Sequence, residues 1–184
     1  PLYTAIGLGL KIAENSIYGK RILTFNAKPE WINLDNCVDF VDCVSTIRHA
    51  GWGMNTNFYA ALDLILDTAI KNSVSPEVMK NTNLVIFSDM QIDQATNQNK
   101  SMFDEISLKY QQAGKASIYR RPYSLPHIIF WNLRTTNGFP QLSSTLNTSM
   151  LSGSNPNLFD LFQDKGPNFL EDITPWKLLQ ESLE

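Results

Sequence analysis

The chain of 184 residues has few of the features that mark a secreted or membrane-embedded protein. It contains two cysteines, Cys37 and Cys43, which are too few for a disulfide framework and lack the partners that a zinc site requires. No apolar run approaches the roughly 20 residues that cross a bilayer, and there is no signal-like start. We therefore expect an intracellular, cytoplasmic protein with reduced thiols, no disulfide and no membrane contact.

The chain also has no excess of basic over acidic residues. Fifteen basic and eighteen acidic residues give a net charge of −3, so no overall positive field attracts nucleic acid. One basic cluster interleaved with tyrosines lies at 115–123 and contains Lys115, Arg120 and Arg121. Such a cluster can contact RNA or an acidic protein surface, or it can be a solvated loop. RNA contact at these residues stays open as an alternative.

The sequence lacks the common enzyme motifs. There is no glycine-rich phosphate loop and no Gly-x-Ser-x-Gly elbow. His49 and His127 fall at the end of a predicted helix and at the start of a predicted strand, where a structural role is favoured. Asp89 and Asp93 resemble the acidic pair of a metal phosphotransferase, but the accompanying lysine and threonine motifs are absent. We predict that the chain is not an enzyme.

The apolar patterning that is present alternates between helical and strand periods. Helices are predicted at 2–15, 38–49, 58–69, from 102 to about 114, 154–162 and 176–183. Strands are predicted at 20–26, 30–34, 83–88, 127–133 and 148–151. Asn36 is the expected cap of the second helix, Asn55 or Thr56 that of the third, and a polar surface loop is expected at 91–100.

This alternation predicts an α/β fold. Strands separated by helices of ten or more residues imply crossover connections, a mostly parallel sheet and helices on both faces, which is a doubly wound architecture. The length suits one hydrophobic core, so we expect residues 1–184 to form a single domain.

Two short segments carry the strongest functional signal. A glycine-flanked loop at 51–58 leads into a helix and contains Thr56, and the strand at 83–88 is followed at once by Asp89. Ligands of open α/β sheets bind at the carboxyl ends of the strands. Hydroxyl and carboxylate oxygens are the ligands that Mg²⁺ prefers. The sequence therefore predicts a divalent cation, Mg²⁺ or another, held by Thr56 and Asp89. The surface expected around it consists of Trp52, Met54, Asn55, Asn57, Ser88 and Met90.

Plainer roles for the same residues remain open. Thr56 can serve as a helix N-cap. Asp89 can cap a short turn after the strand or pair with Arg134, and Asp93 can be a solvated loop carboxylate.

Four phrases carry a family resemblance: WGMNTNF, LVIFSDMQID, IIFWNLR and MLSGS. Together with the element order, they resemble a von Willebrand factor A-like domain. More narrowly, they are similar to the A-like domain of an uncharacterised (DUF2828/DUF7788-like) family of large DNA viruses, plants and microbes, distantly related to the Ro RNA-binding proteins. The resemblance covers roughly residues 1–162.

The resemblance implies a metal-ion-dependent adhesion site built from three loops. Thr56 matches the threonine of the second loop and Asp89 the aspartate of the third. The Asp-x-Ser-x-Ser run of the first loop is missing, and Pro1 stands about where the helix after that run starts. We therefore expect this sequence to be the C-terminal part of a larger protein, without the domain's first strand and with an incomplete oxygen shell for the metal.

Three functions follow, in order of preference. The first is a non-catalytic binding module that uses the adhesion-type metal site to bind a protein partner through an acidic group. The second is an RNA-associated, Ro-like domain. The third is a metal-dependent hydrolase that uses Asp89 and Asp93. If the protein is viral, a virion or a viral factory joins the cytoplasm as an expected location.

Overall fold

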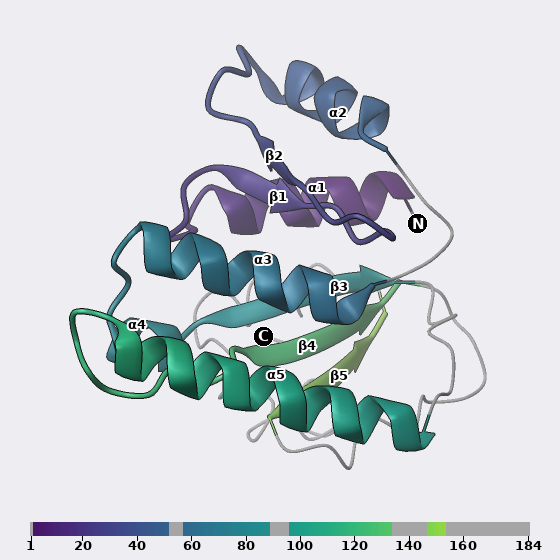
Figure 1. Ribbon diagram of the computed structural model, residues 1–184. Helices are drawn as coiled ribbons and strands as arrows, with labels where there is room; N and C mark the ends of the chain where they lie inside the picture. The colour runs from purple at the N-terminus through teal and green to yellow at the C-terminus, as the bar shows by residue number, and fades with distance from the viewer. Residues whose placement is uncertain (1, 52–56, 89–95, 134–146, 154–184) are drawn as a thin grey trace, which may run out of the picture.

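The computed structural model describes residues 2–51, 57–88, 96–133 and 147–153 of the chain. Helices and strands alternate along these ranges (Figure 1). The helices are α1 (Leu2–Ala13), α2 (Phe40–His49), α3 (Phe58–Lys71), α4 (Pro76–Lys80) and α5 (Thr96–Ala116). The strands are β1 (Arg21–Leu23), β2 (Trp31–Asn33), β3 (Asn83–Ser88), β4 (His127–Asn132) and β5 (Thr148–Ser152).

The strands form two sheets. β3, β4 and β5 make a parallel sheet in that order, while β1 and β2 form a separate antiparallel hairpin. β3 and β4 are joined through α5, the crossover that a parallel pair requires. The expected mixed α/β fold with a parallel sheet is confirmed. The strand predicted at 83–88 has the observed bounds, and the other strands are found within a few residues of their predicted positions.

Alternate side chains of the parallel sheet pack on opposite faces. On one face, which α3 and α5 cross in Figure 1, the sheet contributes Ile86, Ile128 and Phe130 to the main core. On the other face, apolar side chains of α1 pack against Ile129, Trp131 and Leu151. The central strand β4 is buried along nearly its whole length, as its continuous apolar run predicts.

Helix α1 packs on two sides. Leu8 and Ile12 face the parallel sheet, while Ile6 and Leu10 join the cluster formed with the hairpin and α2. Gly9 lies between them, and a Cβ atom there would meet side chains of β1 and β3 at 3.4 and 4.0 Å. Figure 1 accordingly shows α1 between the parallel sheet and α2.

Two helix caps differ from the predicted ones. Asp39, not Asn36, caps α2 by accepting a hydrogen bond from the amide three residues on at 2.8 Å. Asn57, not Asn55 or Thr56, caps α3 in the same way at 3.0 Å. Both predictions were wrong because several cap-forming residues stand close together before each helix. The one that caps must directly precede the first residue with helical backbone angles.

Helix α5 is longer than predicted at both ends. It begins at Thr96, inside the stretch 91–100 that we expected to be a surface loop, and it continues past Gly114 to Ala116. Polar residues such as Gln and Lys are good helix formers, so a polar composition does not by itself indicate a loop. The helices predicted at 154–162 and 176–183 lie outside the described residues. Among the described ranges, no helix has the length and apolarity needed to span a membrane.

Candidate functional site

The three parallel strands end together on polar residues. Ser88 of β3 lies opposite Asn132 of β4, which lies opposite Ser152 of β5. The Asn132 side chain is buried at 4% exposure. The chain after β5 is held on β4, because the amide of Gly153 donates to the carbonyl of Asn132 at 2.9 Å. This row of polar positions occupies the carboxyl edge of the sheet, where α/β proteins bind ligands.

The N-terminus of α3 reaches the same edge. The ring of Phe58, the first residue of the helix, stacks on Phe130 of β4 with 6.1 Å between centroids, and Phe130 is two residues before Asn132. Phe58 also contacts Phe103 of α5 at 5.3 Å. In Figure 1 the carboxyl ends of the parallel strands and the N-terminal ends of α3 and α5 lie on one side of the molecule. The first amides of a helix carry a partial positive charge, which favours anionic groups there.

One residue of the β1–β2 turn connects both ends of the loop that precedes α3. The side-chain amide of Asn26 donates to the carbonyl of Gly51, and the Asn26 carbonyl accepts from the amide of Asn57 at 3.2 Å. Its side-chain oxygen accepts from the amide of Lys28 at 2.9 Å, which fixes the turn. Asn26 therefore sets the separation between Gly51 and Asn57, the residues that flank 52–56.

Replacing Asn26 by Asp tests this connection. The carboxylate keeps an acceptor for the Lys28 amide but places an oxygen against the Gly51 carbonyl, and the donor is lost. We expect a cost of about 1–2 kcal/mol and faster hydrogen exchange in a peptide spanning residues 51–57. Asn36→Asp introduces the same charge change at an exposed residue and serves as the control. Exchange in Asn26→Asp that equals the wild-type rate would contradict the proposed role of Asn26.

The residues predicted to form the site fall into two groups. Ser88 is described as the last residue of β3, and Asn57 as the N-cap of α3. The predicted metal ligands Thr56 and Asp89 lie outside the described residues, as do Trp52, Met54, Asn55, Met90, Asp93 and Arg134. The structure thus places Asn57 and Ser88, the direct neighbours of the two predicted ligands, on elements that end at the same edge of the sheet.

The basic cluster is less suited to stacking bases than its sequence indicates. Lys115, Arg120 and Arg121 are exposed, but Arg121 pairs with Glu77 of α4. Tyr123 is 1% exposed and its hydroxyl donates to a carbonyl of the α3–α4 connection at 2.8 Å. A buried ring that is used in this way cannot serve as a stacking platform for bases. Of the three cations of the cluster, Lys115 and Arg120 are the two that take part in no ion pair with another described residue.

Both histidines make hydrogen bonds within the fold. His49 Nδ1 lies 2.7 Å from the carbonyl of Ser45, one turn earlier in α2. His127 contacts Asn147 and Ser149 at 3.0 and 2.8 Å and so links β4 to β5. The predicted structural role is supported for each.

A hollow of about 630 Å³ lies between the hairpin and the C-terminal end of α2. Its lining combines polar and apolar residues with charges of both signs, and includes Lys28, Glu30, His49 and Gly51. The hollow therefore borders the loop at its Gly51 end. Sequence reasoning identified neither this hollow nor Asn26, because their residues come from segments that are far apart in the chain.

Comparisons with known proteins identify a family to which nearly the whole chain matches. A family model described as a domain of unknown function (DUF7788) matches residues 1–178. The chain is 33% identical over 191 residues to "Uncharacterized protein L728" of Acanthamoeba polyphaga mimivirus; the match covers 100% of this chain and 30% of that protein. The chain thus spans less than a third of the length of this relative. No solved structure matches it. The chain belongs to the DUF7788 family, as the resemblance of its sequence phrases led us to expect.

Proposed function

We propose that this chain is a doubly wound, von Willebrand factor A-like domain that binds a protein partner through a divalent cation held by Thr56 and Asp89. The observation that carries the proposal is the meeting of α3 and β3 at one edge. Phe58 at the start of α3 stacks on β4, and Ser88 at the end of β3 pairs with the last residue of β4. In the sequence, Thr56 directly precedes the cap residue of α3, and Asp89 directly follows the last residue of β3.

The chemistry of the donors fits a hard cation. A threonine hydroxyl and an aspartate carboxylate are oxygen ligands of the kind that Mg²⁺ takes, and water commonly fills several of its positions. Among the described residues, no group of three His, Cys, Asp or Glu side chains is placed to enclose a metal. With two protein oxygens and water around the cation, we propose an open site, in which a carboxylate from the partner occupies a remaining position.

The surroundings support recognition more than catalysis. The partial positive charge at the N-terminus of α3 favours the partner's carboxylate at this edge. We propose that Trp52, Met54 and Met90 form the apolar rim of the contact, and that Asn55 and Ser88 supply polar contacts. Both histidines are hydrogen-bonded within the fold, and His127 begins β4 at the opposite end of the strand from this edge.

Titration with Mn²⁺, followed by electron paramagnetic resonance, tests the proposal on this chain. Two protein oxygens plus water predict weak binding, of the order of millimolar. Asp89→Ala and Thr56→Val are each expected to weaken it by about tenfold or more, whereas Asp93→Ala leaves it unchanged. A glutamate-containing peptide should displace water from the bound Mn²⁺, which lowers its enhancement of water proton relaxation. Undiminished Mn²⁺ binding by Asp89→Ala, with a native circular dichroism spectrum, refutes the metal site.

The same protein distinguishes the other two functions. An RNA-associated domain binds single-stranded RNA with an affinity that falls steeply with salt, because phosphate contacts release counterions. A hydrolase turns over a phosphoester substrate with Mg²⁺ or Mn²⁺ and loses this activity in Asp93→Ala. The pairing of Arg121 with Glu77 and the burial of Tyr123 make the RNA function the less supported of the two binding functions.

A further inference from the structure

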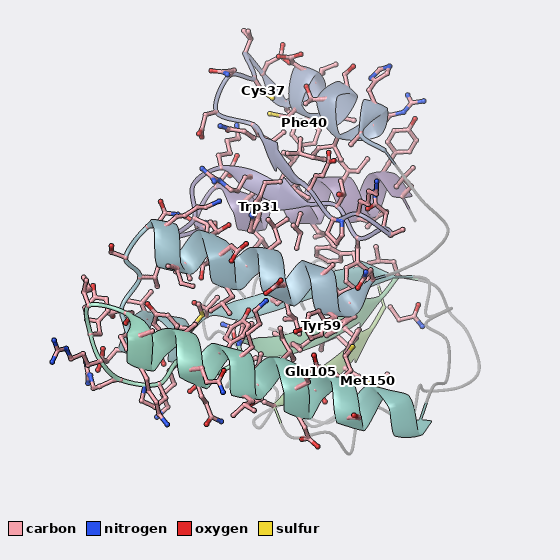
Figure 2. The ribbon with its side chains drawn as sticks, viewed as in Figure 1. Trp31, Cys37, Phe40, Tyr59, Glu105 and Met150 are labelled. Atoms are coloured by element: carbon pink, nitrogen blue, oxygen red, sulfur yellow. The ribbon has the colours of Figure 1, made fainter. Side chains whose placement is uncertain are left out.

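The loop between β2 and α2 brings the two cysteines of the chain together. Cys37 lies in this loop and is partly exposed, while Cys43 in the first turn of α2 is 1% exposed. Cys37 packs against the apolar cluster that contains Cys43. Figure 2 shows Cys37 beside α2, in the layer that also carries Phe40.

Contacts with α2 define where the Cys37 sulfur lies. Its Sγ is 3.9 Å from the hydroxyl of Thr46. Thr46 is three residues after Cys43, so the two side chains are neighbours on the surface of α2. The Cys37 sulfur therefore lies along the face of the helix that carries Cys43.

The two thiols differ in their chemistry. Burial raises the pKa of Cys43, and the neighbouring Cys37 raises it further, while Lys20 acts in the opposite direction. Cys43 is thus protonated and shielded at neutral pH. Because the thiolate is the nucleophile and solvent access is required, the partly exposed Cys37 is the thiol that an external reagent meets first.

We propose that Cys37 and Cys43 form a thiol–disulfide exchange site that reacts with low-molecular-weight disulfides of the glutathione type and closes to an intramolecular disulfide. In the first step the Cys37 thiolate attacks one sulfur of the reagent, whose S–S bond breaks. A mixed disulfide forms on Cys37, and the departing thiolate takes up the proton that Cys37 released.

In the second step Cys43 loses its proton and attacks the Cys37 sulfur. The mixed disulfide breaks, the Cys37–Cys43 bond forms, and the second thiol leaves with that proton. Overall, two protein thiols are oxidised by two electrons, and one external disulfide is reduced to two thiols. Cys43 acts as the resolving thiol, because it lies beside Cys37. Its burial protects it from direct attack by the external reagent.

Closure of this bond has a defined structural effect. The residues between the cysteines include Val38, Phe40 and Val41, whose side chains are 91%, 62% and 73% exposed. In the reduced protein this apolar turn is attached through the Asp39 and Asp42 capping hydrogen bonds. The disulfide ties both ends of the turn to each other and so restricts the surface that these three side chains present.

The experiment uses the reduced, folded chain and oxidised glutathione as the probe. After quenching with N-ethylmaleimide, mass spectrometry of the tryptic peptide 22–48, which contains both cysteines, reports the products. We expect loss of about 2 Da, no maleimide adduct and no retained glutathione in the wild type. Cys43→Ser should stop at one glutathione on Cys37. In Cys37→Ser, Cys43 should react at least about tenfold more slowly than Cys37 does in Cys43→Ser.

Two results overturn the proposal. One is a folded wild-type protein that retains glutathione or stays reduced, while a control in urea shows that both thiols react with oxidised glutathione once the chain is unfolded. The other is a Cys37→Ser variant whose Cys43 reacts as fast as Cys37. Circular dichroism verifies the fold of each variant, and Cys43→Ala replaces Cys43→Ser if the hydroxyl prevents folding in the apolar cluster.

Discussion

Gly114→Ala is expected to destabilise the protein by about 3 kcal/mol or more, because the space that a side chain needs at this position is filled by backbone. A Cβ atom there would lie 2.2 Å from the amide nitrogen of Tyr123, 2.5 Å from the carbonyl oxygen of Arg121 and 2.7 Å from the carbonyl carbon of Pro122. Backbone atoms cannot rotate away as the tip of a flexible side chain can. The loop after α5 must therefore move as a whole.

That movement disturbs the core as well. Tyr123 is 1% exposed, belongs to the main core and donates its hydroxyl to the carbonyl of Val74 at 2.8 Å. Shifting the loop weakens this hydrogen bond and the packing of the ring against the sheet. The cost of Gly114→Ala thus exceeds what the added methyl group alone implies.

Urea denaturation followed by circular dichroism measures the effect of Gly114→Ala. Gly7→Ala is the matched control, because Gly7 is also helical but has nothing within 4 Å of the added atom. Alanine is the better helix former, so this control should gain about 0.5–1 kcal/mol. Equal midpoints for Gly114→Ala and the wild type would show that the loop does not approach the helix as closely as described.

Trp131→Ala is expected to cost about 3–5 kcal/mol, the usual range for truncating a large buried aromatic residue. Trp131 is 1% exposed and packs against Phe87 of β3 with 5.6 Å between ring centroids. Its indole N–H donates to the carbonyl of Gly153 at 2.8 Å. Removing the side chain leaves a cavity beside the sheet and removes one of the hydrogen bonds that hold the chain after β5 to β4.

A less drastic substitution separates the two contributions of Trp131. Trp131→Phe keeps an aromatic ring but loses the hydrogen bond to Gly153, and we expect it to retain more than half of the stability that Trp131→Ala loses. Ile118→Ala, at a side chain that is 78% exposed, should change stability by less than about 0.5 kcal/mol. A Trp131→Ala variant as stable as Ile118→Ala would contradict the buried position of the indole.

The elements that sequence patterning located best are those whose apolar run is continuous and clearly bounded. β3 was predicted with its observed limits because an apolar run lies between Asn83 and Ser88. The caps were misplaced because Asn55, Thr56 and Asn57 are all suitable, and tertiary packing selects among them. Gly114 is a common residue type at a helix end, but here it permits a close backbone approach by residues that follow later in the chain.

The same reasoning explains what was found of the candidate site. The end of a strand and the start of a helix are local signals, and the topology of the parallel sheet brings their described residues, Ser88 and Asn57, to one edge. The hydrogen bonds of Asn26 to Gly51 and Asn57 depend on how the hairpin docks, which no local pattern encodes. The alignment of Asn132 with Ser152 likewise follows from strand register.

The two-sided packing of α1 determines how the molecule loses its structure. Ile6 and Leu10 belong to the layer of the hairpin and α2, while Leu8 and Ile12 belong to the parallel sheet. If either layer detaches, one flank of this helix exposes apolar surface to water and loses part of its support. The two layers therefore share one helix, and we expect them to unfold as one cooperative unit rather than as independent blocks.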